Sequence, residues 1–155
     1  TTRMCMLYLE KMISPGCKVL DLGCGSGILT LAAFKLGAGS VTGLDIEADA
    51  IKASHDNLGK NDLGHEADFH LGSLPNPTIP DGSIDVTVAN ISANILIVLA
   101  PHILATLAHD GVFVGSGLLA ERKDEVEAAF TEVGAEFTDL TISGDWAAFS
   151  AVMRS

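Results

Sequence analysis

The sequence has 155 residues, of which 48% are apolar, and it carries a formal net charge of −11. A chain of this length and apolar content can bury its own core and is expected to form one domain over residues 1–155. The acidic balance disfavours sequence-blind nucleic-acid binding and suits a basic protein partner, although acidity also simply keeps proteins soluble.

The first segment, residues 1–12, has the apolar spacing of an amphipathic helix, with Thr2 as its predicted N-cap. No Met precedes it, and this abrupt start leads us to expect further residues upstream. Apolar runs typical of buried strands then alternate with helical patterns. The runs predicted as strands are residues 18–22, 41–45, 67–71, 84–89 and 112–116. The helices predicted between them are residues 27–36, 47–61, 93–108 and 120–133.

Glycines follow these four helices and are predicted to be their C′ stops. They are Gly37, Gly64, Gly111 and Gly134. Pro101 is predicted to kink the third of these helices or to split it. After the last glycine, residues 136–142 and 146–153 predict two strands joined by a short turn that contains Gly144.

This order of elements predicts the fold class. Strands that alternate with helices indicate a parallel sheet covered on both faces, and the final hairpin adds an antiparallel strand at its edge. We therefore expect a Rossmann-like α/β fold, with a mostly parallel seven-stranded sheet, a C-terminal antiparallel hairpin and helices on both faces.

The segment VLDLGCGSGILT, residues 19–30, lies where the first strand turns into a helix, a common ligand position in such sheets. Its glycines are Gly23, Gly25 and Gly27. The dinucleotide fingerprint G-x-G-x-x-G needs Gly or Ala where this chain has Ile28, so the match fails by one residue. Asp21 would also repel a pyrophosphate, whereas it would attract a cationic amino group. The pattern favours S-adenosylmethionine, which carries an ammonium, a sulfonium and an adenosine but no phosphate.

An acid suited to a ribose follows at the end of the second predicted strand. Asp45 comes about 20 residues after the glycines, a separation at which an acid accepts both ribose hydroxyls. Ile46, beside it, is assigned to the same cofactor site. Two alternatives stay open: Asp45 could be a helix N-cap ahead of Glu47, and Asp21 a solubilising loop residue.

Several segments together resemble the catalytic domain of bacterial methyltransferases that modify the eleventh protein of the large ribosomal subunit. They are TTRMCMLYLE, VLDLGCGSGILTLAAFKLGA, VTGLDIEADAIKASHDN, DVTVANISANILIVLAP, GVFVGSGLLAERKDEV and the late Trp146. The resemblance covers nearly the whole chain. It implies a class I S-adenosylmethionine-dependent methyltransferase that N-methylates lysine or N-terminal amino groups of a ribosomal protein in the cytoplasm.

The resemblance also implies roles for individual residues. Gly23 is similar to a methyl-donor contact and Asp45 to the ribose ligand. Thr2 matches a threonine that closes over the cofactor, with a plain helix cap as the alternative. Asn90, which follows the fourth strand, matches an asparagine between donor and acceptor that orients the acceptor amine; its alternative is a turn-former.

The chain departs from the expected pattern in two places. Many class I enzymes have an acid after the third strand that binds adenine, where this chain has Ser73 as a weaker candidate. The family also carries a separate N-terminal recognition domain, which has no counterpart in these residues. Another acceptor, a protein or a small molecule, and a non-catalytic cofactor-binding module therefore remain alternatives.

Other classes of site and location are not expected. The three cysteines form no CxxC pair or His/Cys cluster, so neither a disulfide framework nor a metal site is predicted. The longest nearly uncharged run, residues 86–108, is too polar to span a bilayer, and no secretory leader opens the sequence. No histidine is a convincing general base; the five are His55, His65, His70, His102 and His109.

Overall fold

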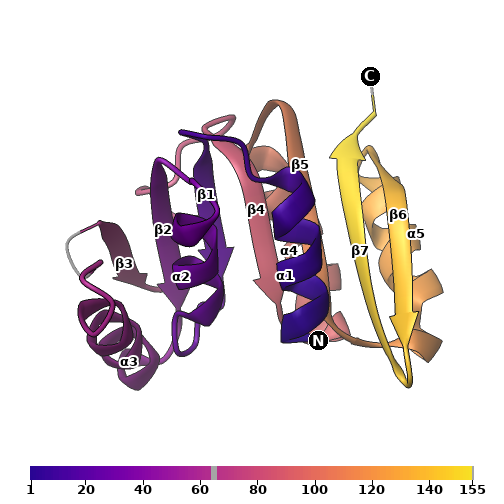
Figure 1. Cartoon of the computed structure of the whole chain (residues 1–155). Helices are drawn as coiled ribbons and strands as arrows, with labels where there is room; N and C mark the ends of the chain where they lie inside the picture. The colour runs from indigo at the N-terminus through magenta and orange to yellow at the C-terminus, as the bar shows by residue number, and fades with distance from the viewer. Residues whose placement is uncertain (64–65, 155) are drawn as a thin grey trace.

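The computed structural model describes residues 1–63 and 66–154, which form a single sheet with helices on both faces (Figure 1). The strands are β1 (Lys18–Leu22), β2 (Ser40–Asp45), β3 (Ala67–Leu71), β4 (Ile84–Asn90), β5 (Leu107–Leu119), β6 (Ala135–Ser143) and β7 (Trp146–Met153). The helices are α1 (Thr2–Met12), α2 (Ile28–Lys35), α3 (Ala48–Gly59), α4 (Ala93–Thr106) and α5 (Lys123–Glu132), with a 3-10 turn η1 (Ala120–Arg122).

The strand order is β3-β2-β1-β4-β5-β7-β6, and it confirms the predicted fold class. Strand β1 pairs in parallel with both β2 and β4, so the order reverses between these central strands. Strand β7 runs antiparallel to both β5 and β6, which makes it the antiparallel strand that the hairpin was expected to add.

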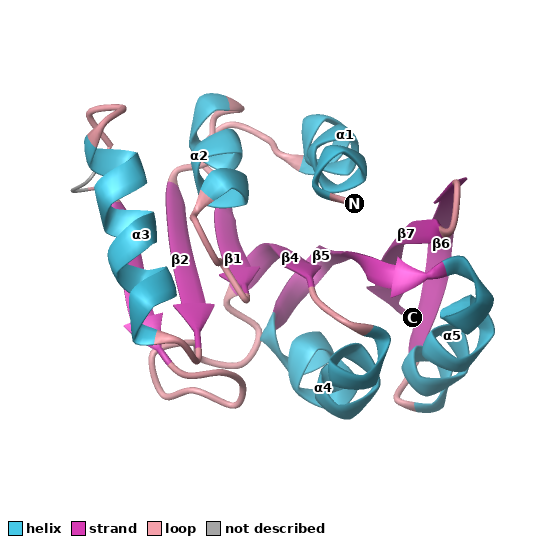
Figure 2. Cartoon of the chain, turned by 90° about the horizontal axis from the view of Figure 1, so that it is seen from below, coloured by secondary structure: helices cyan, strands magenta, loops and turns pink. Residues whose placement is uncertain are grey.

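The two faces of the sheet are covered by different helices. Helices α1, α2 and α3 lie on one face, and α4 and α5 on the other (Figure 2). The α4–α5 face is filled by an aromatic cluster in which Phe113 stacks on Phe130 and meets Phe149 edge to face, all three fully buried. Because both faces are largely apolar and covered by helices, a ligand has access to the sheet at the ends of its strands.

Helix α1 begins one residue earlier than predicted, so the expectation that Thr2 is its N-cap is wrong. Thr1 occupies the N-cap position, and its carbonyl accepts the Cys5 N–H at 3.1 Å without a side-chain cap hydrogen bond. Thr2 is the first helical residue. The N-terminus lies at the edge where the parallel strands end (Figure 1).

The boundary between α4 and β5 also differs from the prediction. Helix α4 continues through Pro101 as one element, so the predicted split does not occur. It ends at Thr106, and the chain enters β5 directly. Gly111 therefore lies inside β5 and is not a helix stop. A Cβ there would lie 2.8 Å from the Ala108 carbonyl oxygen, and this close approach requires a glycine.

The stops predicted for α2 and α5 are confirmed, since Gly37 and Gly134 occupy the C′ positions with φ of 109° and 97°. Gly64, the predicted stop of α3, lies outside the described residues. The three cysteines are free and buried. None of the helices in the described part of the chain is long and apolar enough to cross a membrane.

Candidate functional site

A cavity of about 180 Å³ lies at the carboxyl ends of β1 and β2, beside the point where strand order reverses. Open α/β sheets bind their ligands at this point. The lining residues are Leu22, Gly23, Asp45, Ile46, Gly72, Ser73, Ile91, Ile95 and Leu99. The structure thus brings together four of the predicted site residues, namely Gly23, Asp45, Ile46 and Ser73.

The glycine turn between β1 and α2 forms one wall of this cavity. Gly23 has a φ of 75°, and its N–H donates to the Leu44 carbonyl oxygen on β2 at 2.8 Å. A Cβ at Gly23 would lie 2.7 Å from Cγ2 of Ile91, a neighbouring residue that also lines the cavity. The position therefore demands a glycine for both its backbone angle and its neighbour.

The carboxylate of Asp45 is fixed by two backbone donors. Its Oδ2 accepts the Gly25 N–H and its Oδ1 accepts the Glu47 N–H, both at 2.9 Å. Glu47, and not Asp45, holds the N-cap position of α3, so Asp45 does not cap the helix. Each carboxylate oxygen has two acceptor positions, and both oxygens therefore keep capacity for ligand hydroxyls.

Asp21 lies beneath the turn and does not line the cavity. Its side chain is 1% exposed and accepts the Thr30 hydroxyl at 2.7 Å. Burial raises its pKa to about 6, against the opposing effect of the hydrogen bonds from Thr30. A direct contact between Asp21 and a ligand therefore stays a prediction, as do the ligand contacts expected of Gly25 and Gly27.

Asn90 and Thr2 meet at the same ends of the strands, and Asn90 directly precedes Ile91, which lines the cavity. The Asn90 Nδ2 donates to the Thr2 hydroxyl at 3.2 Å, a contact between residues far apart in the sequence. The Asn90 Oδ1 is buried and has no hydrogen-bond partner. A buried acceptor without a partner is rare in folded proteins, and this one marks a place where a donor group is missing.

Several cavity residues were missed by the sequence analysis. Ile91, which precedes α4, and Ile95 and Leu99, which lie on it, form an apolar stripe at a spacing of four residues. That period, directly after Asn90, is the signal that could have identified them. Ile46 also lines the cavity and is 70% exposed. This apolar surface suits the flat face of a nucleobase.

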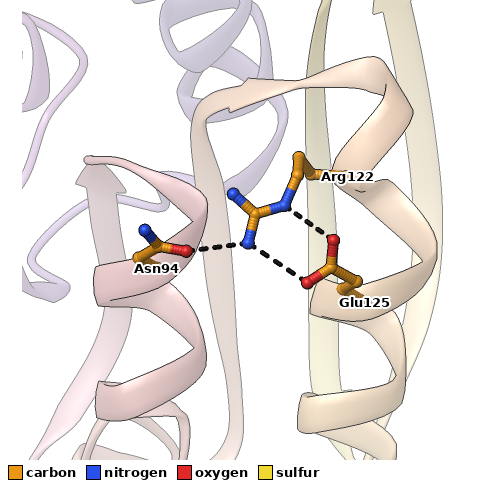
Figure 3. Close-up of polar contacts among 3 residues, drawn as sticks. All are labelled: Asn94, Arg122 and Glu125. Atoms are coloured by element: carbon orange, nitrogen blue, oxygen red, sulfur yellow. Dashed lines mark hydrogen bonds and ion pairs between the residues drawn. The ribbon is translucent and has the colours of Figure 1, made fainter.

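The first turn of α4 is tied to α5 by a polar cluster (Figure 3). The Arg122 guanidinium donates through Nη2 to the Asn94 side-chain oxygen at 2.7 Å. It also donates two hydrogen bonds to the Glu125 carboxylate, from Nε at 2.7 Å and from Nη2 at 3.1 Å. This exposed cluster links the first turn of α4 to the start of α5.

None of the histidines in the described residues lines this cavity. His55 packs edge to face on Phe69, His70 lies near Asp68, and His109 near Asp110. His65 lies outside the described residues.

A larger cavity, of about 630 Å³, lies at the opposite edge of the sheet, near Lys11, Asp85 and His109. It is far from the glycine turn and from the carboxyl ends of the parallel strands. The smaller cavity is therefore the better candidate for the ligand site.

The cavity residues fit a phosphate-free nucleoside. Its described lining contains one acid and no Lys or Arg, so it offers no cation to a phosphate. Ligand pockets are typically about 300–1,000 Å³, so this cavity has room for only one end of such a ligand. The rest of the ligand would extend along the glycine turn towards Asn90.

Comparisons with known proteins agree with this description. The profile of the ribosomal protein L11 methyltransferase (PrmA) family matches residues 1–154. The ribosomal protein L11 methyltransferase of Chloroflexus aurantiacus is 37% identical over 170 residues, which cover 96% of this chain and 52% of that protein. The chain thus spans about half the length of the curated relatives it matches.

Solved structures show the same fold. The crystal structure of a ribosomal protein L11 methylase from Lactobacillus delbrueckii subsp. bulgaricus superposes with a TM-score of 0.93 and 32% identity, covering all of this chain and 79% of that one. A TehB-like SAM-dependent methyltransferase from Corynebacterium glutamicum superposes with a TM-score of 0.76 and 19% identity, covering 97% of this chain and 88% of that one.

Proposed function

The chain belongs to the ribosomal protein L11 methyltransferase family, and from this premise we propose that it N-methylates amino groups of ribosomal protein L11 with S-adenosylmethionine as methyl donor. Its fold is that of class I methyltransferases. The observation that carries the proposal is the unpartnered Asn90 Oδ1 next to a cavity suited to a nucleoside.

The donor would be held by the residues around the cavity. Asp45 accepts the ribose hydroxyls, Ile46 and the α4 stripe cover the adenine, and Ser73 offers it a polar contact. Gly23 leaves bare backbone for the methionyl part. When bound, the donor supplies a methyl group already activated by its sulfonium. The protein must then position the acceptor and exclude water.

The acceptor amine would be oriented by Asn90. A lysine ammonium has a reference pKa of about 10.4 and no lone pair, so it must lose a proton before it can react. Asn90 does not titrate and is not the base; desolvation and transfer to water remove the proton. The free Oδ1 accepts an amine N–H, and this contact directs the nitrogen lone pair.

In this role residues 1–155 act as one catalytic domain in the cytoplasm. The partner is a basic protein, and neither nucleic acid nor a membrane takes part directly. The acidic net charge of −11 supports a basic partner.

Calorimetric titration with S-adenosylhomocysteine, paired with radiolabelled methyl transfer, tests the proposal. We expect donor-product binding and label on purified L11. Binding with label on another component of a cell lysate would indicate a different acceptor. Binding without any labelled product would indicate a non-catalytic module. Tighter binding of NADH than of S-adenosylhomocysteine would contradict the choice of cofactor.

A further inference from the structure

Two side chains of α3 donate hydrogen bonds to the glycine turn, and neither of them lines the cavity. The Ser54 hydroxyl, fully buried, donates to the Gly25 carbonyl oxygen at 2.8 Å. The Asn57 Nδ2 donates to the Ser26 carbonyl oxygen, also at 2.8 Å. The two donors lie one helical turn apart and therefore face the same way.

Helix α3 is in direct contact with this turn. A Cβ at Gly27 would lie 3.1 Å from the Cα, Cβ and Oγ atoms of Ser54. The Ser54 hydroxyl is also 3.5 Å from the Cys24 sulfur. The turn thus rests on α3 as well as on the neighbouring strand.

The hydrogen bonds on the two sides of the turn are connected. The Gly25 N–H is bonded to Asp45, while the carbonyl oxygen of the same residue is bonded to Ser54. Glycine loses more conformational freedom on ordering than any other residue, so a turn with three of them needs external contacts to stay in one conformation. The α3 donors supply those contacts, and the orientation of Asp45 depends on the result.

We infer that Ser54 and Asn57 are positioning residues that keep the glycine turn and Asp45 in the conformation that binds the methyl donor. The inference rests on the proposed function for the identity of the ligand. If the binding conformation is populated only in part, the apparent dissociation constant rises in proportion. Loss of a hydrogen bond from Ser54 or Asn57 therefore weakens binding of the methyl donor, although α3 itself does not contact that ligand.

The test compares Asn57→Ala and Asn57→Asp with Asn61→Ala. Asn57→Asp keeps the shape of the side chain and removes the amide donor. Asn61 is the matched control, because it follows the C-cap of α3 and its Nδ2 donates to the Asn57 carbonyl oxygen, with no hydrogen bond to the glycine turn. The dissociation constant of S-adenosylhomocysteine is measured by calorimetry, and amide hydrogen exchange at residues 23–27 is followed without ligand.

We expect both Asn57 variants to bind S-adenosylhomocysteine about fivefold more weakly than wild type, because one hydrogen bond contributes about 1 kcal/mol. Ser54→Ala should weaken binding by at least the same factor. Exchange in the turn should accelerate, the donor KM should rise at unchanged kcat, and Asn61→Ala should match wild type. Wild-type affinity in Asn57→Asp, or an equal loss in Asn61→Ala, overturns the inference alone. Failure of the wild-type protein to bind S-adenosylhomocysteine overturns the inference and the proposed function together.

Discussion

Among the described residues, the Asn90 Oδ1 is the only buried side-chain nitrogen or oxygen without a hydrogen-bond partner. An unpartnered buried acceptor destabilises a folded protein by about 1–3 kcal/mol. Gly117 lies next to this oxygen, and because it has no side chain it leaves the oxygen uncrowded; a Cβ at Gly117 would lie 3.0 Å from it. The proposed acceptor amine explains why such a group is kept at the end of β4.

Asn90→Ala should therefore lower the rate of methyl transfer while leaving the stability of the protein nearly unchanged. We expect kcat for methyl transfer to fall about a hundredfold, because the amine is no longer oriented. The dissociation constant of S-adenosylhomocysteine should stay within about twofold of wild type. Loss of the hydrogen bond to Thr2 is offset by removal of the unpartnered oxygen, so the free energy of unfolding should change by less than about 1 kcal/mol. Turnover equal to wild type would remove Asn90 from the mechanism.

Asp21 predicts a pH-dependent stability. Burial raises its pKa from 3.8 to about 6, so the folded protein holds this proton more tightly than the unfolded chain does. Its contribution to the free energy of unfolding therefore falls as pH rises from about 4 to about 6. Asp21→Asn cannot ionise, and relative to wild type it should gain up to roughly 3 kcal/mol across this window.

Urea denaturation at several pH values measures this difference. The other carboxyl groups are the same in both proteins, so their contributions to the pH dependence of the free energy of unfolding cancel when the variant is compared with wild type. Asp21→Asn keeps an oxygen that can accept the Thr30 hydroxyl, so the hydrogen bond itself is preserved. A difference in stability that does not vary between pH 4 and pH 7 would show that the Asp21 pKa is ordinary.

At the scale of the element, the glycine turn allows two matched substitutions. Gly23 and Gly25 both have a positive φ, of 75° and 54°, so Ala strains the backbone at either position. Only at Gly23 would the new Cβ collide, 2.7 Å from Ile91, whereas Gly25 has no atom within 4 Å. Gly23→Ala should lose about 1 kcal/mol more stability than Gly25→Ala.

The same substitution should also impair the site. Gly23 and Ile91 both line the cavity, so a Cβ in Gly23→Ala can be accommodated only by a shift that changes the shape of its wall. Binding of S-adenosylhomocysteine should weaken at least about tenfold, which calorimetry measures, while denaturation gives the stabilities. Equal stabilities for Gly23→Ala and Gly25→Ala would show that Ile91 moves away without resistance.

The elements themselves were largely predictable because their patterns are local. Strand runs, helix periods and the stops at Gly37 and Gly134 follow from residues near them in sequence. The junction of α4 with β5 could not be predicted in this way, because α4 does not end at a glycine. The chain leaves α4 at Thr106 and enters β5 directly, and within β5 Asp110 has a φ of 64°. The strand on either side of Asp110 pairs with β4, at Leu107 and again from Val112, and this pairing is a tertiary contact.

At the scale of the whole molecule, the candidate site is assembled by the sheet order. The reversal between β1 and β4 brings Asp45 and the Asn90 segment to the same ends of the strands, and the sequence predicted Asp45 and Gly23 at this site. It did not predict the α3 donors or the burial of Asp21 under α2. A hydroxyl or amide on a helix surface carries no local sign of the carbonyl it will meet.

The net charge of −11 makes a prediction about recognition by the whole molecule. An acidic surface attracts a basic substrate through interactions that salt screens, with a Debye length of about 10 Å at 0.1 M. Raising salt from about 50 mM to about 300 mM should increase the KM for the proposed substrate L11 roughly threefold to tenfold. The dissociation constant of S-adenosylhomocysteine, a small ligand held by local contacts, should change less than about twofold and serves as the control. A KM for L11 that does not respond to salt would mean that the acidity serves solubility and leaves substrate capture to specific contacts.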